Sequence, residues 1–309
     1  MNKNQIEDDF IPIRDHGNGI KTASLHIAQS FFGNIIGSRG ATKNLIEYDT
    51  ETKIKIPQRG YEGDITISGS EIKNVLAAAR MVKDIVARAR LKQRPTHFLS
   101  IPVNSVFMKQ NFNQFKEEVC NLGIDPEYFI EQEKLHLSLL VLNLADKEEE
   151  EIAKKFLDNA KTEIIDPLLN TISFNIRVKG IASMDNKPNK VHVLYAQMVE
   201  TDENNRGLLR RLRNELMEYF SKSGVLAKNY EDGKLHITLL NSANKKDTKT
   251  SPEEVKKRWE KRQPFDATKI FEKLEHFDFG EQSLKEIHIS LMGTAGPDGY
   301  YQSLAAVPI

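Results

Sequence analysis

The sequence predicts an α+β protein with two domains, a small one at residues 20–94 and a larger, two-lobed one at residues 95–309, after a lead-in at residues 1–19. Three observations predict this plan. Residues 23–90 fit the order strand–helix–loop–helix–strand–strand–helix. A charged link ends at Pro95, as domain boundaries often do. Beyond it, one seven-residue segment recurs, which indicates two similar halves related by pseudo-twofold symmetry.

In the small domain, residues 53–57 and 64–68 alternate apolar and polar positions, the period of a strand, and residues 23–27 form a third candidate. Helices are expected at residues 28–36 and 41–51, on either side of Gly37-Ser38-Arg39-Gly40. A longer helix reaches residue 90, with apolar positions at helical spacing and Ser70 as its expected N-cap.

The larger domain alternates strands and helices, and each copy of the repeated segment follows a strand and a helix. The acidic run at residues 148–151 is interpreted as a solvated helix face. Strands are expected near residues 98–103, 135–142, 171–180, 190–199, 235–240, 275–279, 286–292 and 301–306, and helices near residues 111–122, 145–165, 202–221 and from residue 251.

The charges are unevenly distributed, although Lys+Arg and Asp+Glu both number 44. Residues 21–94 hold thirteen Lys or Arg against seven Asp or Glu, a basic excess that suits a polyanion partner. The single Cys120 excludes an internal disulfide framework and fits a reducing compartment. No apolar run is long enough for a membrane span, and the polar, acidic start is unlike a secretory signal.

The Gly37-x-x-Gly40 turn between two helices lets backbone N–H groups approach a ligand, because glycine has no Cβ. With Ile35-Ile36 before it and Ile54 and Ile56 after it, the segment resembles the KH domain of type I, whose order is βααββα. That resemblance implies a grip on single-stranded RNA through the loop. We expect contacts at Gly37, Ser38, Arg39, Gly40 and Lys43; the alternative is a KH fold that docks protein.

The repeated segments are Lys-Leu-His-Leu-Ser-Leu-Leu at residues 134–140 and Lys-Leu-His-Ile-Thr-Leu-Leu at residues 234–240. In a strand, His136 and Ser138 share one face, as do His236 and Thr238. If the two strands are neighbours, two imidazoles and two hydroxyls converge on one cleft. Histidine both accepts and donates protons near neutral pH, and hydroxyls bind phosphate oxygens, so phosphodiester chemistry without a metal or other cofactor is possible there.

At these residues the chain resembles the two-histidine phosphoesterase superfamily, also called LigT-like. The resemblance implies that His136 and His236 act as general base and acid, in either order, and that Ser138 and Thr238 bind phosphate. Ser138 departs from the usual threonine but keeps the hydroxyl. A third His-x-Ser at His288 lacks the Lys-Leu prefix and is interpreted as a chance match.

A KH domain followed by this phosphoesterase domain resembles the activating signal cointegrator 1 complex subunit 1 family. The resemblance implies a nuclear protein that works with a helicase and the other subunits of that complex in transcription and alkylation repair. We expect an enzyme that acts on RNA or nucleotide phosphate ends. The alternatives are a non-catalytic adaptor whose cleft only binds a phosphate or nucleotide, and a structural subunit.

Overall fold

The computed structural model of the chain describes residues 11–17, 19–58, 60, 63–169, 174–202, 205–227, 234–245 and 262–309. These residues form two compact units. The first contains residues up to Arg94 together with Asn143–Glu149, and the second contains Pro95–Leu142 and Glu150–Ile309. Among the described residues, none of the helices has the length and apolar character needed to cross a bilayer.

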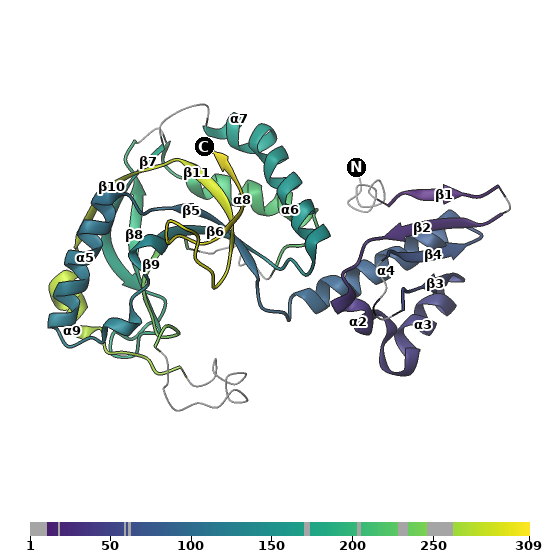
Figure 1. Cartoon of the computed structure of the whole chain (residues 1–309), viewed down its shortest axis with the longest axis horizontal. Helices are drawn as coiled ribbons and strands as arrows, with labels where there is room; N and C mark the ends of the chain where they lie inside the picture. Colours follow the sequence, from purple (N-terminus) through teal and green to yellow (C-terminus); the bar gives the residue numbers. More distant parts are fainter. Residues whose placement is uncertain are drawn as a thin grey trace. The chain divides into compact units, whose positions relative to one another are not determined.

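The first unit is a four-stranded antiparallel sheet covered by helices (Figure 1). The sheet order is β1-β2-β4-β3, and its core contains inward-facing side chains such as Ile54, Ile65 and Ile67. The chain order of the last six elements is the predicted βααββα. The elements are β1 (Ile13–Asp15), β2 (Lys21–Leu25), α2 (Phe32–Ile36), α3 (Ala41–Thr50), β3 (Lys53–Lys55), β4 (Ile65–Gly69) and α4 (Ile72–Arg90).

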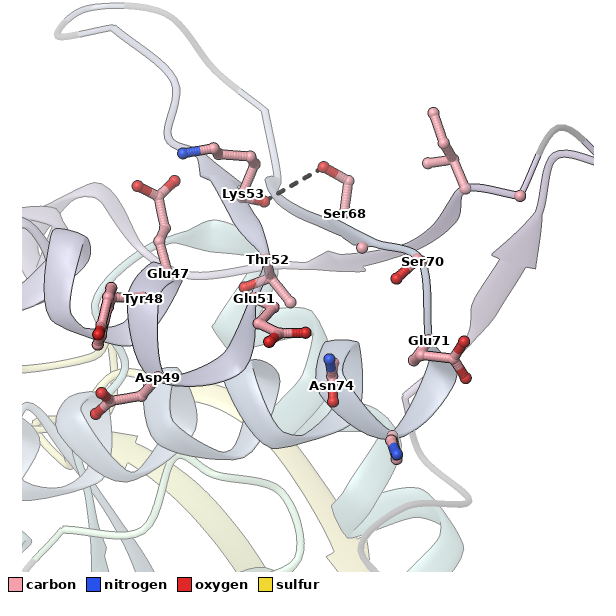
Figure 2. A pocket seen from close by; sticks show the side chains of 14 residues that line it. Glu47, Tyr48, Asp49, Glu51, Thr52, Lys53, Ser68, Ser70, Glu71 and Asn74 are labelled. Atoms are coloured by element: carbon pink, nitrogen blue, oxygen red, sulfur yellow. Dashed lines mark hydrogen bonds between the residues drawn. The ribbon is translucent and has the colours of Figure 1, made fainter.

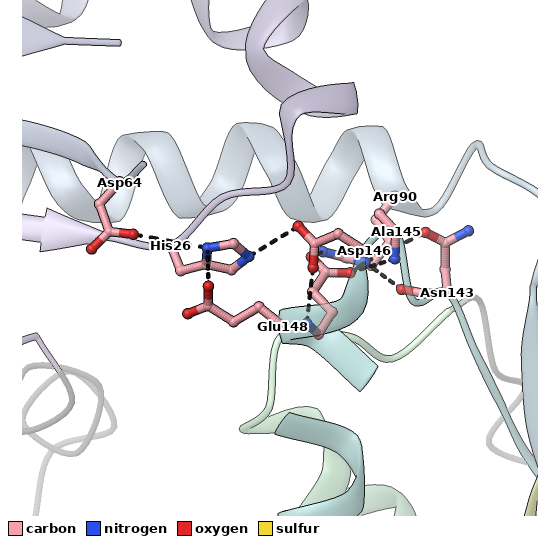
Figure 3. Close-up of polar contacts among 8 residues, drawn as sticks. His26, Asp64, Arg90, Asn143, Ala145, Asp146 and Glu148 are labelled. Carbon is pink, nitrogen blue, oxygen red and sulfur yellow. Dashed lines mark hydrogen bonds and ion pairs between the residues drawn. The ribbon is translucent and has the colours of Figure 1, made fainter. Parts of the chain in front are cut away.

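A segment from much later in the chain completes the first unit. Arg90, at the end of α4, is 3% exposed and forms two hydrogen bonds with the buried Glu149 carboxylate, at 2.8 and 2.5 Å. Figure 3 shows Arg90 next to Asn143, whose backbone carbonyl also accepts from Arg90. In the same figure His26 lies among carboxylates and contacts Asp146 at 3.0 Å. The module is therefore discontinuous in sequence.

The second unit is built on an eight-stranded sheet with the order β10-β7-β8-β9-β6-β5-β11-β12 (Figure 1). All of its strand pairs are antiparallel, and the two repeated segments form the two central neighbours, β6 and β9. Four strands lie on each side of this junction, as the predicted pseudo-twofold plan requires. The strands are β5 (His97–Pro102), β6 (His136–Leu142), β7 (Phe174–Ser183), β8 (Val193–Glu200), β9 (Ile237–Asn241), β10 (Asp278–Leu284), β11 (Glu286–Leu291) and β12 (Ser303–Pro308).

Helices that come from one half of the second unit pack on strands of the other half. α5 contacts β10 of the other half, and α8 contacts β6. Their apolar faces, including Phe112 and Phe115 on α5 and Leu212 and Leu216 on α8, are fully buried. This leaves the opposite face of the central strands for polar side chains. The helices are α5 (Val106–Asn121), α6 (Lys147–Ala160), which continues into a π-helical turn, α7 (Asp166–Leu169), α8 (Leu208–Ser221) and α9 (Thr268–Leu274).

Several local expectations differ from the structure, including the strand expected near residues 275–279, where β10 instead runs from Asp278 to Leu284. The lead-in contains β1, which pairs with β2 through Ile13 and Ala23, so it extends the sheet. Helix α4 has Glu71 as its N-cap and no side-chain cap, so the expected role of Ser70 is wrong. Glu149 is buried against Arg90, so the acidic run is only partly a solvated face. The helix expected from residue 251, with Trp259, lies outside the described residues.

Candidate functional site

The two histidine motifs lie side by side at the centre of the larger sheet. Leu137 of β6 is the antiparallel partner of Ile237 of β9, and both side chains are buried. Residues that flank such a pair face the other side of the sheet. His136 therefore lies near Thr238, and Ser138 lies near His236. All four side chains are partly exposed on one face, so the structure brings the predicted residues together.

Both imidazoles are held by the same backbone contact. Nδ1 of His136 donates to the carbonyl of Lys134 at 2.7 Å, and Nδ1 of His236 donates to the carbonyl of Lys234 at 2.7 Å. In a neutral imidazole the other nitrogen, Nε2, is then the acceptor. Both imidazole rings are therefore held in the same way. In each repeat, Nδ1 faces the backbone carbonyl and Nε2 lies on the other side of the ring. The lysine of each motif contributes this carbonyl, a role that the sequence did not reveal.

The surroundings of the two imidazoles differ. The His136 ring lies 5.0 Å from the ring of Phe98, in a tilted arrangement, and 5.3 Å from that of Tyr301, in an edge-on arrangement. Its Nε2 is 3.0 Å from the hydroxyl oxygen of Ser138. His236 has one aromatic neighbour within such distances, Tyr195 at 5.1 Å, among the residues that the structure describes. His136 is therefore the more enclosed of the pair.

This enclosure has an electrostatic consequence, because burial disfavours the charged imidazolium. Burial lowers the pKa of His136 to about 4, against an opposing hydrogen bond to the Lys134 carbonyl, and the neighbouring His236 lowers it further. Burial also lowers the pKa of His236, again opposed by its carbonyl contact. Both shifts favour the neutral imidazole. A bound phosphate would favour protonation, since a nearby opposite charge raises a histidine pKa.

The third His-x-Ser lies on the same face of the sheet but outside the paired motifs. His288 pairs with Ser100 and Ser290 pairs with Phe98, so β5 separates β11 from β6. The Ser290 hydroxyl is fully buried and lies 2.9 Å from that of Ser100, which also accepts from Tyr300 at 2.9 Å. This motif belongs to a buried polar network beside the cleft. Its position supports the interpretation that it is not a third copy of the phosphoesterase motif.

Tyr300 and Tyr301, which the sequence left unassigned, have separate roles. Tyr300 joins the serine network, whereas Tyr301 packs on His136 and Phe98. Burial raises the pKa of Tyr301 to about 12, with a smaller effect of Glu131, so its phenol is neutral near pH 7. A tyrosine pair after a glycine-rich turn carries no signal that would locate it at His136.

The glycine loop of the first unit is built around positive φ angles. Gly37 has φ 71° and Gly40 has φ 83°, and Arg39 between them has φ 52°. A Cβ on Gly37 would lie 2.1 Å from Thr42 Oγ1, so only glycine fits there. Ser38 and Arg39 are exposed at the tip, immediately before α3. The loop therefore has the geometry expected for a backbone-gripping turn.

Lys43 follows the loop on the first turn of α3 and contacts Glu47 at 2.9 Å. The same carboxylate oxygen accepts the backbone N–H of Ile54 at 2.6 Å and so joins α3 to β3. Glu47 was not among the residues expected from sequence, because an i, i+4 pair on a helix is usually a surface feature. It borders a hollow of about 1150 Å³, the α3–β3 hollow, drawn in Figure 2 and lined also by Tyr48, Lys53 and Glu71.

No group of three or more histidine, cysteine, aspartate or glutamate side chains in the described part of the chain is arranged to hold a metal ion. The site described here consists of imidazole, hydroxyl and aromatic groups. Together, the loop module and the paired-histidine sheet define a class of protein in which a KH domain is joined to a LigT-like, two-histidine phosphoesterase domain.

Comparison with known proteins shows the same two parts. Residues 22–84 match the KH domain family, and residues 95–309 match the family described as AKAP7 2'5' RNA ligase-like domain. Activating signal cointegrator 1 complex subunit 1 of Mus musculus is 32% identical over 296 residues, which cover 92% of this chain and 83% of the mouse protein. The chain belongs to the activating signal cointegrator 1 complex subunit 1 family, so the resemblance seen in the sequence is confirmed.

Two solved structures have low similarity to this chain. E. coli LigT in complex with 3'-AMP has a TM-score of 0.40 and 16% identity, and covers 70% of this chain and 99% of LigT. LigT in its apo form has a TM-score of 0.39 and 17% identity, and covers 70% of this chain and 98% of LigT. The family assignment rests on the sequence matches.

Proposed function

We propose that this protein binds single-stranded RNA through its KH domain and hydrolyses a phosphodiester or cyclic phosphate at an RNA or nucleotide end in the paired-histidine cleft. The observation that carries the second part is the pairing of β6 with β9, which places His136 and His236 on one face with both Nδ1 atoms fixed by equivalent carbonyls. In this proposal each Nε2 exchanges a proton with the substrate or water, and that of His136 does so once the Ser138 hydroxyl, 3.0 Å away, turns to the phosphate.

The two histidines have different roles in this proposal. His136, the more enclosed ring with the lower pKa, is the general base, because it stays neutral most readily. Its Nε2 takes a proton from water as the water oxygen forms a bond to phosphorus. The bond from phosphorus to a ribose oxygen breaks, and the His236 imidazolium donates its proton to that oxygen. One proton enters and one leaves the pair, and the product is a phosphomonoester.

The hydroxyls of Ser138 and Thr238 lie on the same face and bind the non-bridging phosphate oxygens. Ser138 now hydrogen-bonds His136 Nε2, and a bound phosphate would compete for that hydroxyl. The monoanionic phosphodiester between the rings also raises the pKa of His236, which makes it a competent acid. Binding of the substrate therefore favours the imidazolium form of His236, which is the form that acts as the acid.

Hydrolysis of RNA that ends in a 2′,3′-cyclic phosphate tests the catalytic proposal. His136→Ala and His236→Ala should each lower the rate about 10²–10⁴-fold, the usual contribution of a general acid or base. His288→Ala is the matched control, since His288 occupies the third His-x-Ser and lies outside the cleft. Unchanged hydrolysis by both cleft variants would refute the assignment.

A second candidate is a non-catalytic adaptor whose cleft recognises a phosphate or nucleotide end. One observation favours it: the pKa values of both histidines are lowered, which disfavours the imidazolium that an acid catalyst requires. Titration with cyclic and linear oligonucleotides, together with product analysis, separates the two. Binding that depends on both histidines but yields no product with any oligonucleotide would support the adaptor.

We further propose that the protein is nuclear and acts as a subunit beside a helicase in transcription and alkylation repair. The support is the mouse relative, whose name makes it a subunit of the activating signal cointegrator 1 complex. Affinity purification of the tagged chain from nuclear extract should recover a helicase and other subunits. Recovery of none of them, or a tagged chain excluded from nuclei, would refute this part.

A further inference from the structure

The free edge of β3 is occupied by a side chain. β3 is the last strand of its sheet, and the Ile54 N–H donates to Glu47 Oε1 instead of to another strand. In an antiparallel strand the N–H and C=O of one residue point to the same edge. A base that approached β3 from α3 would therefore meet the Glu47 carboxylate before the Ile54 N–H.

Lys43 and Glu47 form a partly buried charged pair at this edge. Their side chains are 27% and 10% exposed, and the lysine ammonium contacts the same Oε1 that Ile54 uses. Burial raises the pKa of Glu47, but the hydrogen bonds from Ile54 and Lys43 outweigh it and the net pKa is lowered. The carboxylate is therefore ionised at neutral pH. No hydrogen bond from the described residues reaches Oε2, which can accept from a ligand.

The pair lies on α3, between the glycine loop and the α3–β3 hollow. Lys43 is three residues beyond Gly40, and Glu47 is one helical turn further along α3. Glu47 is one of the residues that line the α3–β3 hollow (Figure 2). Its lining carries four carboxylates against two lysines, Lys53 and Lys73, so the negative charges outnumber the positive ones and disfavour phosphate groups. The hollow therefore suits an uncharged base more than the backbone.

We propose that Lys43 and Glu47 together read a guanine base of the bound RNA; this inference rests on the proposed RNA binding of the KH domain. Guanine carries an acceptor, O6, next to two donors, N1–H and N2–H₂. The ammonium donates to O6, and Oε2 of the carboxylate, which has two lone pairs, accepts from both donors. Both contacts involve a charged group and are about twice as strong as neutral hydrogen bonds.

The other bases fit this pair less well. Adenine and cytosine place an acceptor nitrogen, N1 or N3, where the carboxylate needs a donor. Uracil offers the acceptor O4 for the ammonium and the donor N3–H for the carboxylate, but it lacks the second donor. One good two-contact pairing discriminates by about 1–3 kcal/mol, which corresponds to roughly five-fold to more than a hundred-fold in affinity. Guanine should therefore be preferred by at least about five-fold.

The test measures the affinity of the full chain for fluorescently labelled uridine oligonucleotides by anisotropy. Each oligonucleotide carries one central guanine, adenine or cytosine, or no substitution. Glu47→Gln keeps a carbonyl oxygen for the Ile54 N–H but removes the charge, and Lys43→Met removes the ammonium. Both variants should bind all four oligonucleotides with nearly equal affinity. Lys92→Met, a charge-matched control that is exposed just after α4 and does not line the hollow, should keep the guanine preference, and thermal melting verifies that each variant is folded.

The outcomes separate the two proposals. Measurable but equal binding of the four oligonucleotides, or a preference for another base, would overturn guanine reading and leave RNA binding standing. A guanine preference that survives in both Glu47→Gln and Lys43→Met would also overturn it. Failure of the folded wild type to bind any of the oligonucleotides would overturn RNA binding and guanine reading together.

Discussion

Replacing His136 with asparagine should weaken the acid sensitivity of the larger domain. Asparagine keeps an N–H for the Lys134 carbonyl but does not titrate. In the wild type the pKa of His136 falls from its ordinary 6.5 to about 4 on folding. Each pKa unit is worth about 1.4 kcal/mol, so the shift corresponds to roughly 3 kcal/mol.

The sign follows from proton binding. As pH falls from 6.5 towards 4, the unfolded chain takes up a proton at residue 136 that the folded chain does not, so the folded state loses stability. Above pH 6.5 both states are neutral and the effect vanishes. Hence the wild type should lose roughly 3 kcal/mol more than His136→Asn between neutral pH and pH 4.

Hydrogen exchange of the β6 amides, corrected for the intrinsic rate at each pH, measures this difference in the full chain. Exposed His16, which contacts Thr22 in the first unit, supplies the control: His16→Asn should follow the wild type. An identical pH dependence in His136→Asn and the wild type would show that the enclosure by Phe98 and Tyr301 does not suppress protonation.

Three other perturbations have definite expected outcomes. Gly37→Ala forces a Cβ against Thr42 at positive φ. It should lower the free energy of unfolding, measured by urea denaturation, by about 1–3 kcal/mol and should weaken RNA binding. Gly33→Ala, with open space around it, should do neither. Arg90→Met leaves the buried Glu149 charge unpaired and should lower stability by about 3–5 kcal/mol, against little change for exposed Arg88→Met. Tyr301→Ala opens one side of His136 and should raise its pKa from about 4 towards 6.5 in an NMR titration; an unmoved pKa would contradict that role.

Much of the fold was predictable, because its signals are local. Alternation located β3 and β4, and the duplicated segment identified the two strands that meet at the sheet centre. β1 was missed because residues 13–15 lie in a polar stretch with no strand-like alternation, and the strand forms only by pairing with β2. Pairing of this kind depends on tertiary structure, which overrides weak propensity.

The candidate site was predictable only in part. The histidines and hydroxyls are repeated, and repetition is visible in a sequence. The Tyr301 contact with His136 joins residues far apart in the chain, and nothing local specifies it. Glu149 was misread because a glutamate within an acidic helical run looks solvated; its partner, Arg90, is 59 residues away.

The late segment at Asn143–Glu149 has a consequence for synthesis on the ribosome. His26 contacts a carboxylate 120 residues downstream, and Arg90 one that is 59 residues downstream. A nascent chain that has emerged only as far as residue 94 holds every strand of the amino-terminal sheet, yet it lacks the partner of a buried guanidinium. The first module to leave the ribosome thus cannot reach its final stability until the chain has been translated beyond strand β6, as far as Glu149.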